Sequence, residues 1–124
     1  MRGRGFTLIE LLVVMAIVAL LLAIAAPRYF THLDRSKEAA LRQTLAVTRD
    51  AIDKFHADVG RYPETLEELV DKRYLRKLPT DPLLDSSADW QIVPPPAGAA
   101  AGVLYDLKSG APGSGPDGMP YAEW

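Results

Sequence analysis

The sequence of 124 residues contains no cysteine and only two histidines. Without cysteine the chain can form neither a disulfide scaffold nor a thiolate metal site. It also lacks a Ser/His/Asp or Cys/His constellation, a phosphate-binding glycine loop and the spacing of metal ligands. These absences argue against an enzyme, and we predict that the chain has no catalytic residues.

An excess of positive charge is also missing, because 14 basic residues stand against 16 acidic ones. A nucleic-acid interface needs a clustered basic face. Basic and acidic residues are interleaved here instead, as between Asp34 and Glu38. We therefore expect no nucleic-acid partner, and we expect a solvated helix face with local ion pairs at residues 34–38.

Charge is almost absent from residues 6–26, where Glu10 is the one charged side chain. As a helix with a rise of 1.5 Å per residue, this run spans roughly 30 Å, the thickness of the hydrocarbon core of a bilayer. Arg2 and Arg4 precede it and keep the N-terminus in the cytoplasm by the positive-inside rule. We expect a single membrane-spanning helix in the bacterial inner membrane, with the C-terminal domain in the periplasm.

A secretory signal peptide and a simple signal anchor are the plainer alternatives for this segment. The apolar run is longer than the stretch of about 7–15 residues that is typical of signal peptides. It also contains a carboxylate, and a helical pattern continues beyond Pro27. These features favour a segment that remains part of one long helix.

Glu10 is the most informative residue of the apolar run. A carboxylate in hydrocarbon costs about 2.5–3.5 kcal/mol or more, and it therefore needs a partner. Cleavage before Phe6 would create an amine one helical turn away, but both groups would then belong to the same helix end. The amine of a neighbouring subunit, shifted along the axis, can neutralise the carboxylate instead. This predicts assembly by helix packing, with Glu10 setting the axial register.

The segment Gly5-Phe6-Thr7-Leu8-Ile9-Glu10, followed by an apolar helix, resembles the class III signal of type IV prepilins and type II secretion pseudopilins. The resemblance implies cleavage between Gly5 and Phe6 by a prepilin peptidase, which also methylates the new amine of Phe6. It implies that Glu10 pairs with the methylated amine of an adjacent subunit. Pro27 lies where pilins carry a helix-kinking proline, and a simple membrane-exit marker is the alternative.

Apolar residues continue at helical spacing through residues 27–59, and a glycine and a proline follow. We expect one helix from Phe6 to Val59, with a transmembrane part at 6–26 and an amphipathic part at 27–59. The aromatic side chains of Tyr29 and Phe30 suit a membrane interface.

Residues 60–124 predict a small globular region after the leader (1–5) and the long helix. Thr65-Leu66-Glu67-Glu68 has the form of a capping box and predicts a short helix. Residues 90–93 and 102–107 are typical of two antiparallel strands joined by a proline- and alanine-rich loop. The aromatic tail at 121–124 is expected to fold back as a last short strand. The fold class is therefore α+β, with a long N-terminal helix packed against a small antiparallel sheet.

The second half of the chain contains five further motifs, which are Asp50–Phe55, Gly60–Pro63, Leu66–Leu69, Asp81-Pro82 and Tyr105–Gly110. With these motifs it resembles the major (G-type) pseudopilins of the type IV pilin-like superfamily. That resemblance implies a structural subunit of the periplasmic pseudopilus of a type II secretion system, which drives protein export across the outer membrane. The implied partners are further copies of the chain, minor pseudopilins, the inner-membrane assembly platform and the prepilin peptidase.

Two other functions remain open at this point. A type IV pilus subunit, major or minor, would serve adhesion, motility or DNA uptake. Many such pilins carry a longer variable domain and a loop closed by cysteines, and this sequence has neither. A membrane-tethered periplasmic binding module would need no cleavage before Phe6.

Members of the G-type family often bind calcium in the loop near the C-terminus. The resemblance implies carboxylate ligands from Asp106 and Asp117, with main-chain carbonyls from Leu107 or Ser109. Calcium needs six to eight oxygen ligands, and Pro112 stands where the family pattern has an acidic residue. Two acidic residues in a Gly/Pro loop are also typical turn formers.

Overall fold

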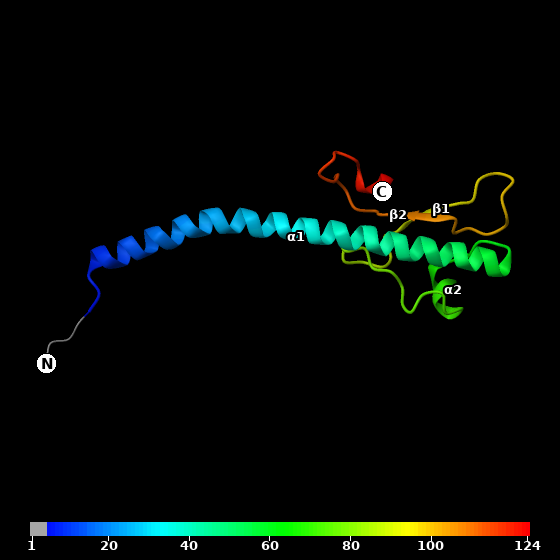
Figure 1. Cartoon of the computed structure of the whole chain (residues 1–124), viewed down its shortest axis with the longest axis horizontal. Helices are drawn as coiled ribbons and strands as arrows, with labels where there is room; N and C mark the ends of the chain where they lie inside the picture. Colours follow the sequence, from blue (N-terminus) through cyan, green and yellow to red (C-terminus); the bar gives the residue numbers. More distant parts are fainter. Residues whose placement is uncertain (1–4) are drawn as a thin grey trace. The chain divides into compact units, whose positions relative to one another are not determined.

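The structure is a computed structural model that describes residues 5–124. Residues 1–4 of the predicted leader lie outside the described residues. They include Arg2 and Arg4, on which the prediction of membrane orientation depends. The chain divides into two compact units, Met1–Ser36 and Lys37–Trp124, and each is described by itself. In chain order the elements are α1 (Leu8–Val59), α2 (Leu66–Asp71), β1 (Gln91–Val93), β2 (Asp106–Lys108) and the 3-10 helix η1 (Tyr121–Glu123) (Figure 1).

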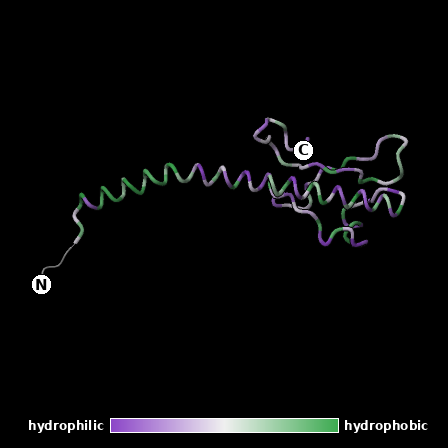
Figure 2. Tube along the Cα trace, viewed as in Figure 1, coloured by the Kyte–Doolittle hydropathy of each residue, from purple (hydrophilic) through white to green (hydrophobic). Residues whose placement is uncertain are grey.

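Helix α1 begins two residues after the predicted start at Phe6 and ends at Val59 as predicted. It runs through Pro27 without interruption, and the hydroxyl of Thr31 donates a hydrogen bond of 2.9 Å to the carbonyl oxygen of Pro27. The hydrophobic residues of α1 are concentrated in its first half (Figure 2). Every residue from 5 to 37 is exposed within the chain. The first half of α1 is therefore long and apolar enough to cross a membrane, and none of its side chains from residue 8 to residue 37 is buried.

The core of the second unit forms on one face of α1. In Figure 1 the C-terminal half of α1 runs between α2 on one side and the β1–β2 hairpin on the other. The apolar side chains repeat every three or four residues, so a single helix face enters the core. The fully buried members from α1 and its neighbours are Leu41, Leu45, Ile52, Phe55, Leu69, Leu104 and Leu107.

The two strands form the predicted antiparallel pair, with Ile92 opposite Leu107. The first strand lies where the sequence predicts it. The predicted start of the second strand is wrong, because β2 begins at Asp106 rather than at residue 102. The amides of Val103 and Leu104 donate to the carbonyl oxygen of Pro63 instead, at 3.2 and 2.8 Å. The chain before β2 is therefore held by the turn after α1.

Gly102 makes this close approach possible. A Cβ at this position would lie 2.3 Å from the carbonyl oxygen of Tyr62, and the φ angle of +123° is one that other residues rarely adopt. The neighbouring amide of Tyr62 donates to the carbonyl oxygen of Ala101 at 2.7 Å. A side chain here would push the segment before β2 away from the end of α1.

Helix α2 begins at the predicted cap. The hydroxyl of Thr65 accepts a hydrogen bond of 3.2 Å from the amide of Glu68, as a capping residue does. The Glu68 carboxylate turns to Arg61, whose guanidinium donates to both oxygens at 2.7 and 3.2 Å. This bidentate hydrogen bonding from Arg61 lowers the pKa of Glu68.

The predicted last strand at residues 121–124 is wrong, because this segment forms η1. The amide of Glu123 donates to the carbonyl oxygen of Pro120 at 2.9 Å, which closes a tight helical turn. The rings of Tyr121 and Trp124 meet edge to face at 4.9 Å, and the guanidinium of Arg42 lies 4.1 Å from the centre of the Trp124 rings. The C-terminal aromatic residues are thus held by side chains on α1.

The predicted local ion pairs at residues 34–38 are also wrong. Within residues 5–124 the ion pairs are Arg49–Asp106, Lys54–Asp50 and Arg61–Glu68. Glu38 instead accepts a hydrogen bond of 2.8 Å from the hydroxyl of Tyr121. The tertiary contact replaces the helix-surface pair that spacing alone suggests.

Candidate functional site

The predicted cleavage bond lies in non-helical chain just before α1. Gly5, Phe6 and Thr7 have no regular secondary structure, and Phe6 is 90% exposed. Exposed chain outside a helix is the kind of backbone that a peptidase can bind in its cleft. The geometry is compatible with processing between Gly5 and Phe6, which stays a prediction.

Thr7 and Glu10 form a capping box at the start of α1. The amide of Glu10 donates to the hydroxyl of Thr7 at 3.1 Å, and the amide of Thr7 donates to a carboxylate oxygen of Glu10 at 3.4 Å. The sequence reasoning missed this pair, although its T-x-x-E spacing is the same as that of Thr65 and Glu68. The cap makes the helix begin directly after the predicted cut.

The contacts of Glu10 leave its charge uncompensated within the described part of the chain. Its carboxylate is exposed and makes no ion pair among residues 5–124. Its one hydrogen-bond donor within this range is the amide of Thr7, which lies 3.4 Å away and carries no formal positive charge. The carboxylate lies in one surface recess with the apolar side chains of Phe6, Ile9 and Val13. A cation from another molecule can therefore reach it on a surface suited to helix packing.

The predicted calcium ligands lie in three separate sets of contacts. Asp106 and Leu107 meet at Arg49, whose Nε donates to Asp106 Oδ1 at 2.7 Å and whose Nη2 donates to the Leu107 carbonyl oxygen at 3.2 Å. Ser109 is buried, and its hydroxyl donates to the buried carboxylate of Asp81. Asp117 is exposed and accepts from the amide of Met119 at 3.1 Å. The hydrogen bonds join Asp106 to Leu107, but connect neither Ser109 nor Asp117 to them.

These residues do not fit a calcium site as they are arranged. The guanidinium of Arg49 takes the place beside Asp106 and Leu107 that a cation would need, and its Nη2 also donates to the main-chain oxygen of Trp124 at 2.7 Å. Lys108 brings a second positive charge to that oxygen at 3.2 Å. No group of three or more potential metal ligands of the His, Cys, Asp or Glu type occurs in the part of the chain that the structure describes. Arg49 was not identified by sequence reasoning, because its partners lie 57 and 75 residues away.

Arg49 should therefore stabilise the C-terminal segment without calcium. We expect the melting temperature of the full-length chain in detergent to be the same in excess calcium and in excess EGTA. The substitution Arg49→Met removes charge-assisted hydrogen bonds of about 1.5–3 kcal/mol and should lower the melting temperature by about 6 °C or more. Differential scanning calorimetry measures both effects.

The control for this experiment is Lys54→Met, which removes an exposed ion pair with Asp50 from the same helix. Exposed pairs of this kind contribute little to stability, so the melting temperature should stay close to that of the unaltered chain. A clear rise of the melting temperature with calcium, or an Arg49→Met variant as stable as the control, would contradict the role given to Arg49.

Comparison with known proteins gives matches to both units of the chain. Residues 1–26 match the family model of the prokaryotic N-terminal methylation motif. The type II secretion system core protein G of Pectobacterium carotovorum subsp. carotovorum is 31% identical, over 98% of this chain and 81% of the relative. The core protein G of Escherichia coli (strain K12) is 29% identical, over 94% of this chain and 84% of the relative.

A type IV pilin is also similar, over a shorter part of the chain. The type IV major pilin protein of Myxococcus xanthus (strain DK1622) is 38% identical over 68 residues, which are 55% of this chain and 31% of the pilin. No solved structure gives a significant match. The similarity to core protein G therefore extends through both units, whereas the similarity to this pilin covers little more than half of the chain.

Proposed function

Since the chain belongs to the family of type II secretion system core protein G, we propose that it is a structural subunit of the periplasmic pseudopilus of a type II secretion system. In this role it assembles through its N-terminal helix and drives protein export across the outer membrane. The observation that carries the proposal is the 31% identity over 98% of the chain, which includes the globular unit as well as the N-terminal helix.

The precursor is anchored in the inner membrane by the first half of α1, with its N-terminus in the cytoplasm and its globular unit in the periplasm. A prepilin peptidase cuts between Gly5 and Phe6 and methylates the new amine. Thr7 and Glu10 already cap the helix at this point, so the cut leaves a formed helix end with a free positive charge. On an adjacent subunit, that charge is the partner that Glu10 lacks among residues 5–124 of its own chain.

Assembly moves the apolar half of α1 from lipid into a bundle of identical helices. Lipid tails are as apolar as leucine side chains, so packing and polar contacts decide whether such helices associate. The pairing of Glu10 with the methylated amine of an adjacent subunit removes much of the cost of an unpaired carboxylate in an apolar surrounding. The further partners are minor pseudopilins and the inner-membrane assembly platform, and no catalytic role is proposed.

Deletion of the gene should abolish export, because the pseudopilus would lose its structural subunit. We expect the exported proteins to accumulate in the periplasm and to disappear from the culture medium, which quantitative proteomics of the two fractions measures. Surface pili seen by electron microscopy should be unchanged, and a plasmid copy of the gene should restore export.

A type IV pilus subunit is the second candidate, favoured by the similarity to the M. xanthus major pilin. The same deletion separates the two functions. If pili disappear from the cell surface while export continues, the chain is a pilin and the proposed secretion role is wrong.

A further inference from the structure

We propose that a basic face of α1, formed by Arg28, His32 and Arg35, binds the phosphate groups of anionic phospholipids at the outer surface of the membrane that holds residues 6–26. The proposal rests on the membrane-anchored state of the proposed function and adds a ligand to it. The three side chains follow each other at steps of four and three residues, so they share one side of the helix.

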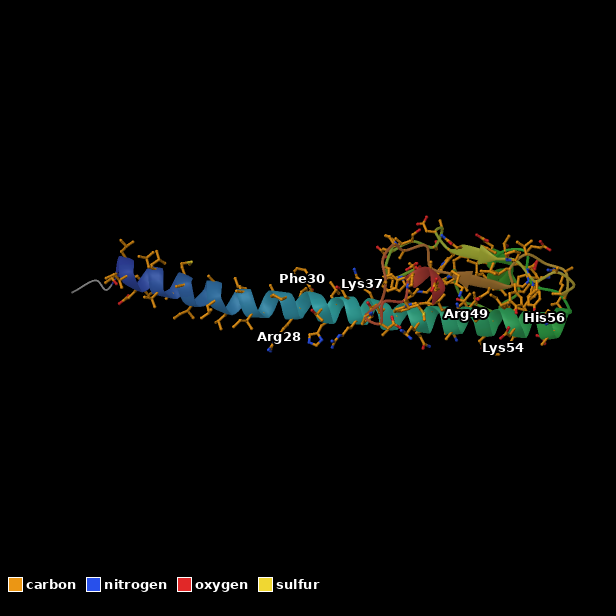
Figure 3. The ribbon with its side chains drawn as sticks, turned by 90° about the horizontal axis from the view of Figure 1, so that it is seen from above. Arg28, Phe30, Lys37, Arg49, Lys54 and His56 are labelled. Carbon is orange, nitrogen blue, oxygen red and sulfur yellow. The ribbon has the colours of Figure 1, made fainter. Side chains whose placement is uncertain are left out.

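The three residues line a shallow recess of about 390 Å³ on α1, together with Pro27 and Thr31. All three are exposed. Arg28 and Phe30 project from opposite sides of the helix (Figure 3). The basic face is therefore distinct from the side that carries Phe30.

The nearest acids, Asp34 and Glu38, form no ion pair with the basic face among the described residues. Arg28, His32 and Arg35 make no ion pair among residues 5–124. Glu38, three residues beyond Arg35, accepts a hydrogen bond of 2.8 Å from the hydroxyl of Tyr121. Asp34 lies about 120° around the helix from Arg28, because each residue advances the helix by about 100°. An anionic ligand can thus approach the face without displacing an internal partner.

The basic face begins in the headgroup layer. Polar headgroup regions add roughly 5–7 Å on each side of the hydrocarbon core. At 1.5 Å per residue, Arg28 lies roughly 3 Å and Arg35 roughly 13 Å beyond Ala26. Helical side chains lean toward the N-terminus, and arginine is long enough to reach back to the interface. Arg28 therefore lies at the level of the phosphates, and Arg35 reaches them by extending its side chain back toward the membrane.

An aromatic pair marks the same level of the helix independently. The rings of Tyr29 and Phe30 are 65% and 61% exposed and meet edge to face at 5.7 Å. Aromatic side chains of this kind concentrate at the membrane–water interface. The pair places the interface at residues 29–30, which is the level of Arg28 along the helix axis.

The chemistry of the face favours phosphate as the ligand. Each guanidinium group can bind phosphate oxygens through two parallel hydrogen bonds, and the imidazole of His32 adds a further N–H donor. In the proposed orientation the positive-inside rule gives no reason for basic residues on this side of the membrane. A subunit that leaves the bilayer for the filament must release these headgroups, so anionic lipid would oppose its extraction.

Native mass spectrometry of the full-length chain in detergent can test the proposal by titration with phosphatidylglycerol or phosphatidylcholine. We expect tighter binding of phosphatidylglycerol, and we expect the double substitution Arg28→Gln/Arg35→Gln to weaken it by about thirtyfold. The double substitution Arg73→Gln/Arg76→Gln is the control, since it removes the same charge from exposed positions in the globular unit. Inorganic phosphate alone should not displace the lipid.

Several results would overturn the proposal. The first is equal binding of phosphatidylglycerol and phosphatidylcholine. The second is an equal loss of phosphatidylglycerol binding in both double variants. The third is complete displacement of the lipid by inorganic phosphate, which would show a site for a free anion. A double variant that keeps its lipid but fails to form filaments would show that the face meets acidic residues of a second copy instead. The lipid measurement needs no secretion machinery, so it stands whether the deletion experiment indicates a pseudopilus or a surface pilus.

Discussion

Replacement of Glu10 by valine should abolish filament formation and protein export, while the precursor still inserts and its globular unit still folds. Removal of one partner from a buried ion pair costs about 3–5 kcal/mol, because the other charge remains unpaired. A loss of this size weakens each subunit contact by roughly a hundredfold or more. Electron microscopy of filaments from overproducing cells and assays of secreted protein measure the effect.

The capping box requires a second variant at the same position. Glu10→Gln keeps an oxygen that can accept from the amide of Thr7, but it removes the negative charge. If the intermolecular charge pair matters, this variant should also fail to assemble, whereas Thr7→Ala, which removes the hydroxyl of the cap, should assemble better than either. Normal filaments from Glu10→Gln would leave only the capping role for this residue.

Replacement of Phe55 by alanine should unfold the globular unit at temperatures at which the unaltered chain is folded. Phe55 is fully buried, its ring meets Tyr74 edge to face at 5.3 Å, and the guanidinium of Arg61 lies 5.2 Å from its centre. Substitutions of buried Phe by Ala cost about 3–5 kcal/mol, which corresponds to a drop in melting temperature of about 12 °C or more for a domain of this size. Thermal unfolding of the full-length chain in detergent, followed by near-ultraviolet circular dichroism, measures this change.

Val47→Ala is the matched control for Phe55→Ala, because Val47 lies on the same helix and is 48% exposed. Its effect on the free energy of unfolding should stay within about 0.5 kcal/mol. The far-ultraviolet signal of the first half of α1 should persist in both variants, since no residue from 5 to 37 belongs to the core. If Phe55→Ala had the same melting temperature as Val47→Ala, the ring of Phe55 would not contribute to the stability of the core.

Local signals in the sequence predicted the elements well. The cap at Thr65, the end of α1 at Val59 and the first strand near residues 91–93 all depend on residues a few positions apart. Caps, helix faces and strand alternation act over three or four residues, so their patterns can be read directly from the chain. The same logic would have found the capping box at Thr7 and Glu10.

Long-range contacts decided where local reasoning failed. The second strand starts late because Pro63 binds the amides of residues 103 and 104, and the tail is η1 rather than a strand because its aromatic rings pack near α1. Glu38 bonds to Tyr121 across 83 residues instead of pairing within its own helix. Pairings of this kind follow from the packing of whole elements, which no short window of sequence contains.

The sequence by itself determined the processing signal, the apolar helix at residues 6–26 and the isolated carboxylate of Glu10, because these depend on composition and on spacing along one helix. Only the tertiary structure decided what holds the C-terminal segment. Arg49 and Asp106 meet across 57 residues, and the guanidinium binds two of the oxygens that the calcium prediction assigns to the ion. The tertiary structure also decided that Glu38 accepts a hydrogen bond from Tyr121, and that no ion pair forms at Arg28, His32 or Arg35 within the described residues.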